Sequence, residues 1–375
     1  MAPAVHYLSH PFATGYGVAG RRLVLALVDL GVELSWTPID FGLDTWRYDP
    51  ARPVHPDLAP LRSRPIDADV VVVHAIPEVI PGIEHLRPPG AALVCHTVWE
   101  HVELQPHWPA LLNRCDGVVV PTEWNAAAFA DAGVTVPIAV VPHVASIDPE
   151  VDAAWLGPAG LDLGDRTVFH SLAAWNDRKQ PGTTVDAFTR AFGPDDDVVL
   201  VLKTDQEIAH PLPAPPGPPG RRRLTSWSVA TIVHRNHPAP DVRITHQSLS
   251  DAQVAALHRR SDCWLSLPHA EGWDLGAFDA ATVGTPVITT DTPGPASYLG
   301  GSPLLVPGAP APNPAVAGTT WVDPDLDAAI ERLRAHHADP DPARRWAATH
   351  AVELRERYDP HAVAGQFLAA VSSML

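Results

Sequence analysis

Two acidic side chains stand out in the stretch HAEGWDLGAFDAATVGTPVITTD at 269–291. Glu271 lies just before an expected helix start, Asp274 is a suitable N-cap for that helix, and Asp279 lies inside it. Ordinary helix chemistry would explain an acid near a helix N-terminus, and a loop glutamate can simply be solvated. Carboxylates are also hydrogen-bond acceptors that suit the hydroxyls of a sugar or a ribose. The second interpretation predicts a site for a hydroxyl-rich ligand.

Cations are the second feature that could do chemistry. Arg178 and Lys179 lie at a loop-to-helix junction in AAWNDRKQPGTT, and Lys203 ends the apolar run VVLVLK. Such charges suit a diphosphate, although exposed basic residues are the ordinary alternative. The chain as a whole is acidic, with 26 lysines and arginines against 43 acids and a formal net charge of −17. This balance argues against nucleic acid as a partner, because a phosphate backbone is usually bound by a basic face.

Two further candidates follow expected strands in the first half of the chain. Gly15, Tyr16 and Gly17 open a helix in HPFATGYGVAGRRL, where glycines let the backbone approach a ligand and unpaired N–H groups attract an anion. An ordinary strand-to-helix turn would look the same, and the glycine pattern is incomplete as a dinucleotide fingerprint. His96 follows the apolar run AALVC. In a chain with 20 histidines, one histidine after a strand is weak evidence by itself.

The elements that must position these residues alternate between strands and helices. Runs rich in β-branched residues predict strands at 4–10, 32–39, 68–75, 91–97, 116–122 and 137–144, and again at 166–173, 197–203, 242–247, 263–268, 286–291 and 302–308. Helical patterns lie between them at 20–31, 123–133, 185–192, 251–260, 275–284 and 325–337. Continuous apolar runs such as DVVVVHA suit parallel strands that are buried on both faces. The pattern predicts an α/β fold with two Rossmann-like, doubly wound parallel sheets.

Domain boundaries follow from the restart of this pattern. A chain of 375 residues exceeds the size of one hydrophobic core. We expect an N-terminal domain over 1–150 and a C-terminal domain over 151–357, with a last helix at about 358–375 that packs back on the first domain. The proline-rich stretch 210–223 is expected to be a surface loop. Because ligands of such sheets bind outside the carboxyl ends of the strands, the candidate residues would line an interdomain cleft.

The surroundings of the protein are suggested by its cysteines and its apolar segments. Cys95, Cys115 and Cys263 are widely spaced in apolar runs, which predicts buried reduced thiols rather than disulfides or a zinc site. The N-terminus has no signal-peptide pattern, and no apolar run reaches transmembrane length. We expect a cytoplasmic protein without a metal or a transmembrane segment, and the sequence leaves a peripheral membrane contact open.

Several segments of the sequence together resemble a known family. The segment HAEGWDLGAFDAATVGTPVI is similar to the Glu-x7-Glu signature of retaining GT-B glycosyltransferases, especially family four, with aspartate in place of the second glutamate. Other blocks agree in order and spacing: HTVWEH with the following N-domain stretch, AAWNDRKQPGTTVDAF, and SLSDAQVAALHRRSDCWLSLPHAEGW. The resemblance covers nearly the whole chain except the proline-rich loop, and the combined order is more specific than any single block.

The resemblance implies roles for residues that match the family pattern. Glu271 would contact hydroxyls of the donor sugar, Asp279 the nucleotide ribose, and Lys179 the diphosphate. His96 would face the donor sugar, and Gly15, Tyr16 and Gly17 would lie under the phosphates. Backbone groups of the remaining matched positions would meet the sugar, the diphosphate or the nucleobase: Gly272, Trp273, Asp274, Leu275, Gln247 and Leu249. The acceptor would enter from the first half, lined by Trp99, Glu100 and Trp108.

Three positions depart from the family pattern. Asp279 is one methylene shorter than the usual glutamate, so its ribose contact would be longer or bridged by water. Asp274 replaces a glycine, and because a carboxylate that caps this helix would compete with the diphosphate for the same N–H groups, Asp274 either turns away or binds a sugar hydroxyl. The arginine that usually precedes the lysine falls near Ala173, and Arg178 or Lys203 would have to substitute for it.

The resemblance implies transfer of a sugar from a nucleotide diphosphate sugar, UDP- or GDP-linked, to a hydroxyl or amine of a glycan or small-molecule acceptor. The anomeric configuration would be retained through a front-face route, without a further cofactor. Two other hypotheses stay open: a GT-B epimerase or phosphorylase, and a non-catalytic protein that binds sugar nucleotides. An epimerase would consume donor without acceptor, and a binding protein would release no nucleoside diphosphate.

Overall fold

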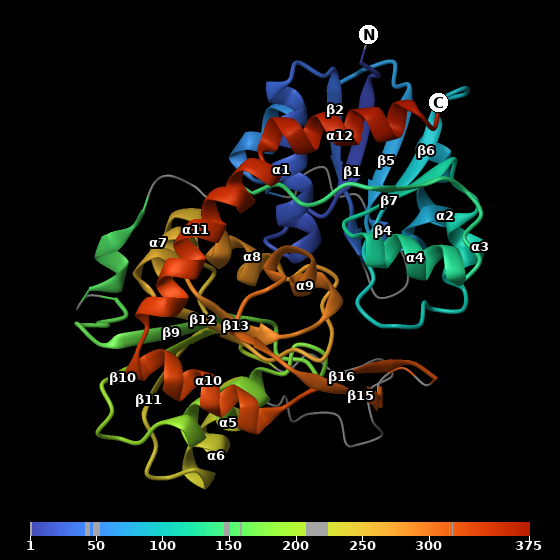
Figure 1. The fold of residues 1–375 in the computed structure, drawn as a ribbon. Coiled ribbons are helices and arrows are strands. Elements are labelled where there is room, and N and C mark those ends of the chain that lie inside the picture. The colour runs from blue at the N-terminus through green and yellow to red at the C-terminus, as the bar shows by residue number, and fades with distance from the viewer. Residues whose placement is uncertain are drawn as a thin grey trace. The chain divides into compact units, whose positions relative to one another are not determined.

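The chain forms two compact α/β units, seen in a computed structural model that describes residues 2–41, 46–47, 53–145, 151–157, 160–207, 224–314, 316 and 318–375 (Figure 1). Unit 1 comprises Met1–Ser146 and Glu356–Leu375, and unit 2 comprises Ile147–Arg355. The sequence placed the domain boundary at 150/151 and 357/358, a few residues from these limits. The proline-rich stretch 210–223 lies outside the described residues.

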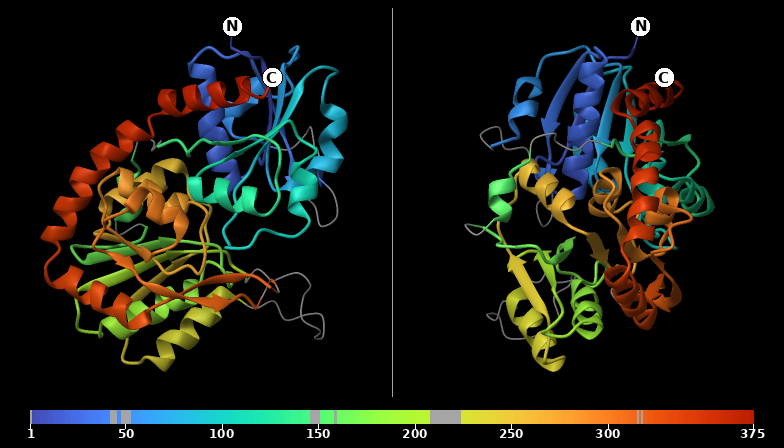
Figure 2. Two further views of the ribbon diagram at one scale, coloured as in Figure 1. Left: turned by 45° about the vertical axis from the view of Figure 1, so that its right-hand side comes forward. Right: turned by 60° about the vertical axis from the view of Figure 1, so that its left-hand side comes forward.

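Unit 1 is built on a parallel sheet with the order β2-β1-β5-β6-β7-β8. Its strands are β1 Val5–Ser9, β2 Leu34–Pro38, β5 Val70–His74, β6 Ala92–His96, β7 Gly117–Val120 and β8 Ile138–Val140, with a short antiparallel pair β3 Asp40–Phe41 and β4 Trp46–Arg47. Its helices are α1 Gly15–Asp29, α2 Ile80–Ile83, α3 Trp108–Leu112, α4 Glu123–Asp131 and α12 Pro360–Ser372, with 3-10 helices η1 Pro56–Leu61, η2 Pro77–Val79 and η3 Glu84–Leu86. The last helix of the chain, α12, packs beside the first helix, α1 (Figures 1 and 2).

Unit 2 repeats the architecture with the strand order β11-β10-β9-β12-β13-β14. Its parallel strands are β9 Thr167–Leu172, β10 Val198–Lys203, β11 Asp241–Thr245, β12 Cys263–Ser266, β13 Val287–Thr290 and β14 Leu305–Val306, followed by an antiparallel hairpin of β15 Gly308–Pro312 and β16 Thr320–Pro324. Its helices are η4 Ala153–Leu156, α5 Pro181–Ala191, α6 Thr225–Arg235, α7 Asp251–Arg260, α8 Leu275–Thr282, α9 Pro293–Leu299, α10 Leu326–Ala338 and α11 Asp341–Arg357.

The burial pattern explains why these segments form parallel sheets. Strand β5 reads VVVVH and is buried along its whole length, as expected for a central strand covered by helices on both faces. In unit 2, alternate residues of the central strands divide between two apolar clusters, with Leu200 and Leu202 on one face and Val199 and Val201 on the other. The predicted α/β fold with two Rossmann-like sheets is confirmed. Among the described residues no helix is both long and apolar enough to cross a membrane.

Candidate functional site

The donor residues predicted for the second half gather at one edge of the unit 2 sheet. Because its strands are parallel, their carboxyl ends share that edge. The loop after β9 carries Arg178 and Lys179, and the loop after β12 carries Glu271. Lys203 ends β10 at the same edge. Lys179 and Lys203 are the only lysines of the sequence, and both lie at or after the carboxyl end of a strand of this sheet.

Glu271 is the centre of the site in unit 2. Its side chain is only 7% exposed, and its two carboxylate oxygens lie 2.6 Å from Lys179 Nζ and 3.0 Å from Arg178 Nη1. Burial by itself raises the pKa of Glu271, but the charges and hydrogen bonds of Arg178 and Lys179 outweigh burial and lower it. Glu271 is therefore an anion that two cations hold in place.

The two loops that carry these charges are joined by backbone contacts. Arg178 Nη1 donates to the carbonyl of Ala270 at 2.8 Å, and the N–H of His269 donates to the carbonyl of Arg178 at 2.8 Å. The N–H of Lys179 donates to Asn176 Oδ1 at 2.9 Å. Gln180 then takes a left-handed conformation, φ 46°, directly before Pro181 begins α5. The ion pairs therefore connect loops that are already fixed relative to each other.

A hairpin that the sequence did not predict supports the same loop. In β16, Val322 exchanges hydrogen bonds with His269: its N–H donates to the His269 carbonyl, and its carbonyl accepts from His269 Nδ1, both at 2.9 Å. The Trp321 and His269 rings are stacked, with centroids 4.1 Å apart and 13° between planes. Strand β15 reads GAPAP and lacks strand-forming residues, and the strand-forming run of β16, TWV, is too short to give a signal by itself.

Gly294 closes the loop from the other side. Its N–H, at the start of α9, donates to the Glu271 carbonyl at 3.1 Å. A Cβ on Gly294 would lie 2.4 Å from that same carbonyl oxygen and 2.6 Å from the nitrogen of Trp273, so only glycine fits. Gly272 and Trp273 are buried in this contact, and Leu275, which begins α8, is partly exposed.

Asp274 neither turns away nor lies free in the loop. It caps α8 with Oδ1, which accepts from the Ala277 N–H at 3.4 Å, while Oδ2 accepts from Ser266 Oγ at 3.3 Å. Its backbone is left-handed, φ 65°, which explains why glycine is the easier residue at such a position. Burial, followed by the negative charge of Glu271, raises the pKa of Asp274 to about 6.

Asp279 lies further along α8 and is also buried, at 6% exposure. Its backbone carbonyl accepts a hydrogen bond from the Thr282 hydroxyl at 2.8 Å. Aspartate is rarely buried without a partner or a function. The two acids of the opening motif therefore both lie inside unit 2 rather than on a solvated surface.

The remaining donor candidates of unit 2 lie on neighbouring strands. The N–H of Ala173, where the family arginine is missing, donates to the Lys203 carbonyl at 3.1 Å, so Lys203 lies beside that position. Arg178, the other possible substitute, contacts Glu271 directly. Gln247 is exposed and Leu249 partly exposed in the segment after β11. The structure thus brings Arg178, but not Lys203, to the Glu271 carboxylate.

The candidates of unit 1 form a separate polar cluster. His96 ends β6 and is stacked on His74 of β5, with ring centroids 3.9 Å apart and 4° between planes. Burial, and then neighbouring histidines, lowers the pKa of both imidazoles well below the usual range. His143 lies beside both rings, and burial followed by the charge of Arg22 lowers its pKa to about 3. These histidines are neutral at pH 7, and sequence reasoning had singled out only His96.

The glycine turn opens a helix as predicted, but local packing accounts for part of its sequence. Helix α1 begins at Gly15, and Thr14 Oγ1 accepts from the Gly17 N–H at 3.2 Å. A Cβ on Gly17 would lie 1.9 Å from the Phe12 carbonyl oxygen, so glycine is required for this turn with or without a ligand. The Tyr16 hydroxyl contacts Thr97 Oγ1 at 3.1 Å, which ties α1 to the segment after β6.

The predicted acceptor residues are mostly core residues in this structure. Trp99 and Trp108 are both buried, with ring centroids 4.7 Å apart, and belong to the apolar core of unit 1. Their indole N–H groups donate to the Glu103 carbonyl and to Glu78 Oε1. Glu100 is only partly buried. The burial of the two indoles favours a structural role for them, because tryptophan buries a large apolar area.

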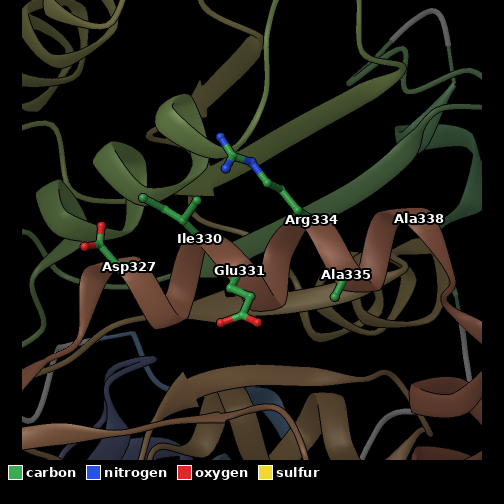
Figure 3. A pocket seen from close by; sticks show the side chains of 6 residues that line it. All are labelled: Asp327, Ile330, Glu331, Arg334, Ala335 and Ala338. Atoms are coloured by element: carbon green, nitrogen blue, oxygen red, sulfur yellow. The ribbon is translucent and has the colours of Figure 1, made fainter.

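A hollow elsewhere in unit 2 has a different character (Figure 3). It encloses about 590 Å³ along α10 and is lined by Asp327, Ile330, Glu331, Arg334, Ala335 and Ala338. Arg334 turns toward α5, where it donates to the carbonyls of Arg190 and Ala191. The Glu331 side chain points away from the Arg334 side chain. Its polar groups do not converge, so it is a poor binding site. The described residues hold no group of three or more His, Cys, Asp or Glu that could bind a metal.

Part of the chain is similar to a known protein family. A family model described as a family 4 glycosyltransferase in conflict systems matches residues 221–367, a range that includes Glu271, Asp274 and Asp279. No curated protein matches the chain. The predicted resemblance to family-four glycosyltransferases is confirmed over this range.

Solved structures match the whole chain. HepE from Anabaena, in complex with UDP and glucose, is 13% identical with a TM-score of 0.66, covering 99% of this chain and 100% of that one. Sucrose-phosphate synthase from Thermosynechococcus elongatus is 15% identical with a TM-score of 0.68, covering 99% of each chain. The UDP-forming trehalose-phosphate synthase from Burkholderia vietnamiensis is 14% identical with a TM-score of 0.64, covering 100% and 99%. At these identities the likeness shows the fold, which is GT-B.

Proposed function

We propose that this chain is a retaining glycosyltransferase that moves a sugar from a nucleotide diphosphate sugar to a hydroxyl or amine of a glycan or small-molecule acceptor. The observation that carries the proposal is the buried Glu271 carboxylate held by Arg178 and Lys179. It lies at the sheet edge where α/β proteins bind ligands. The family-four match over 221–367 and the GT-B fold support the same activity.

The charges of this site suit a nucleotide diphosphate sugar. Arg178 and Lys179 carry two positive charges against one on Glu271, and while Asp274 is protonated this leaves a surplus that attracts a diphosphate. Arg178 can bind two phosphate oxygens at once through its planar guanidinium. Glu271 would accept hydrogen bonds from sugar hydroxyls, and Asp279 from the ribose. In this assignment Arg178 takes the place of the family arginine that is missing at Ala173.

In the proposed transfer, the bond between the anomeric carbon and the diphosphate oxygen breaks, and a bond to the acceptor oxygen or nitrogen forms on the same face of the sugar. The acceptor proton passes to the leaving phosphate oxygen. Lys179 and Arg178 stabilise the negative charge that develops on the leaving group, and fixed cations need no reorganisation at that moment. Removal of Lys179 should therefore affect turnover more than donor binding.

The nucleotide is proposed to be UDP or GDP. The HepE structure contains UDP and glucose, which makes UDP-glucose the first donor to test. A thermal-shift screen of UDP-, GDP-, ADP- and dTDP-linked sugars should raise the melting temperature for one nucleotide class, because a ligand that binds only the folded state stabilises it. If no sugar nucleotide stabilises the chain at millimolar concentration, the proposed donor site is wrong.

Retention can be tested directly on the product. With the donor found by the screen, we expect the product to keep the anomeric configuration of the donor, as read from its one-bond C–H coupling in NMR. An inverted product would contradict the retaining mechanism. Consumption of donor to an isomeric sugar nucleotide without any acceptor would instead identify an epimerase.

We also infer that the protein works in the cytoplasm. Cys95, Cys115 and Cys263 are all free and buried, and burial raises their pKa well above the usual range, which keeps them as unreactive thiols. Free thiols suit a reducing compartment. Localisation of a tagged chain by fractionation tests this inference.

A further inference from the structure

A tyrosine hydroxyl joins the two stacked histidines of unit 1. Tyr7, on β1, is fully buried, and its hydroxyl oxygen lies 2.8 Å from His74 Nδ1 and 3.2 Å from His96 Nδ1. Burial raises the pKa of Tyr7 well above its usual range, so the phenol keeps its proton. Both imidazoles are neutral for the reason given above. One neutral phenol therefore contacts two neutral imidazoles.

Counting protons restricts how these three groups can bond. A phenol has one proton to donate, and a neutral imidazole carries its proton on only one of its two nitrogens. Tyr7 cannot donate to both Nδ1 atoms. If both Nδ1 atoms donated to Tyr7, its own buried O–H would lack an acceptor, which is costly. The arrangement that satisfies the Tyr7 hydroxyl and both Nδ1 atoms gives the two histidines opposite tautomers: one Nδ1 accepts from Tyr7, and the other donates to it.

The two distances indicate which histidine accepts a hydrogen bond from Tyr7 and which donates one to it. An O–H donor usually makes a shorter hydrogen bond than an N–H donor. The 2.8 Å contact to His74 is then the one in which Tyr7 donates, and the 3.2 Å contact is the one in which His96 Nδ1–H donates to Tyr7. His96 consequently carries its lone pair on Nε2. That atom is buried and has no hydrogen-bond partner among the described residues.

We propose that Tyr7 is a positioning residue that holds His96 as the Nδ1–H tautomer, so that His96 Nε2 accepts a hydrogen bond from a hydroxyl of the donor sugar. This inference rests on the proposed function. The family resemblance implies only that His96 faces the donor sugar, whereas the tautomer makes His96 Nε2 the acceptor and the sugar hydroxyl the donor of the hydrogen bond. Tyr7 does not touch the sugar. It acts through His96 by fixing which nitrogen carries the proton.

The packing around the three rings keeps this geometry. The Phe367 ring, on α12, lies 6.2 Å from the Tyr7 ring and 6.0 Å from the His96 ring. A Cβ on Gly20 would lie 3.2 Å from His74 Nδ1, so α1 also approaches closely. Replacing Tyr7 with phenylalanine removes only the hydroxyl and leaves these ring contacts in place. Tyr7→Phe is therefore the variant that tests the hydrogen bonds rather than the core.

The first test reads the tautomer in the free protein. In histidine-¹⁵N-labelled protein, with signals assigned by His96→Gln and His74→Gln variants, we expect His96 to be the Nδ1–H form and His74 the Nε2–H form. In Tyr7→Phe, His96 should become a mixture of tautomers. His170 is an internal control, because its Nδ1 can only donate to the Cys263 carbonyl, at 3.2 Å. An Nε2–H signal for His96 in the wild type, or no change in Tyr7→Phe, would overturn the proposal whether or not the chain transfers sugar.

The second test uses donor analogues in which each sugar hydroxyl is replaced by hydrogen or by fluorine. Fluorine cannot donate a hydrogen bond, so at one hydroxyl both replacements should lower kcat/KM equally, by about five- to tenfold, the size of one hydrogen bond. In Tyr7→Phe the penalty at that hydroxyl should shrink to about twofold or less, because His96 no longer holds one tautomer. A fluorinated donor that works as well as the natural one at every position would overturn the proposal. Absence of transfer with every donor, together with the expected NMR result, would instead overturn the proposed function and the sugar contact.

Discussion

At the scale of single residues, Asp274 is a position where this chain departs from the glycosyltransferase pattern that it resembles. Its carboxylate caps α8 and lies close enough to Glu271 for the two charges to interact. When Asp274 is ionised it cancels the surplus positive charge of the Glu271, Arg178 and Lys179 cluster. The raised pKa, about 6, places that change within the working range of most enzymes. Asp274 therefore weakens both the folded state and the attraction for a diphosphate as the pH rises.

Asp274→Asn should remove the loss of folded-state stability that the ionised Asp274 causes. Because the folded state holds the Asp274 proton up to about pH 6 and the unfolded state loses it near 4, this group lowers stability as the pH rises between those values. Asparagine tolerates the left-handed backbone and keeps an acceptor for the cap. We expect unfolding free energy to rise at pH 8 by on the order of 2–3 kcal/mol, and by much less at pH 4.5, in urea titrations.

Donor affinity gives a second readout of the same variant. Removing the Asp274 charge should lower the KM for the donor at pH 8 and leave it nearly unchanged at pH 5. Asp262→Asn is a suitable control, since Asp262 precedes β12 at the opposite end of that strand. If Asp274→Asn changes stability and KM equally at both pH values, its ionisation is not the cause.

At the scale of elements, the hairpin β15–β16 supports the loop that carries Glu271. The loop is held from three sides: by Arg178 after β9, by Gly294 at the start of α9, and by Val322 and Trp321 of β16. Loops built this way keep charged groups in a fixed geometry, which electrostatic catalysis requires. The hairpin is therefore part of the candidate site, because it fixes the loop that carries Glu271.

Trp321→Ala should loosen that loop. The stacked His269 ring would lose its partner, and kcat/KM should fall by about tenfold, with KM for the donor rising more than kcat falls. Trp321→Phe should restore most of the activity by keeping an aromatic face. Trp227→Ala on α6 is the matched control, because Trp227 is 70% exposed. Equal losses in Trp321→Ala and Trp227→Ala would show that the stack has no particular role.

At the scale of the whole molecule, the sequence predicted the sheets well because buried parallel strands are continuous apolar runs. Every predicted strand overlaps an observed one, and the segments that follow β12 and β9 led to Glu271 and to Arg178 and Lys179. The sequence could not show that Arg178 rather than Lys203 meets Glu271, because that depends on how two loops fold back. It also missed Tyr7, His74 and the hairpin, since a lone tyrosine or histidine in an apolar strand and a proline-rich segment carry no periodic signal.

Unit 1 should lose more stability in acid than unit 2. In unit 1, burial lowers the folded-state pKa of His74, His96 and His143, so the unfolded state binds more protons below about pH 6.5 and stability is lost as the pH falls. In unit 2, burial likewise lowers the pKa of His170 and His336, but Asp274 acts with the opposite sign between about pH 4 and 6 and offsets part of that loss. Hydrogen exchange followed by mass spectrometry should show protection falling first in unit 1 between pH 7 and pH 5. Earlier loss in unit 2 would contradict this account.

The central claim is that Lys179 and Glu271 form the working site of a glycosyltransferase. The most direct measurement is the rate of nucleoside diphosphate release from the donor found by thermal shift, in the presence of an acceptor, for the wild type, Lys179→Ala and Arg344→Ala. Arg344 is a matched surface cation, paired with Asp262. We predict that Lys179→Ala still folds, with a lower melting temperature because the buried Glu271 loses one of its two cations, and that its kcat falls by about 100-fold or more, while kcat of Arg344→Ala stays within about twofold of the wild type. Near-normal release by folded Lys179→Ala would contradict the account.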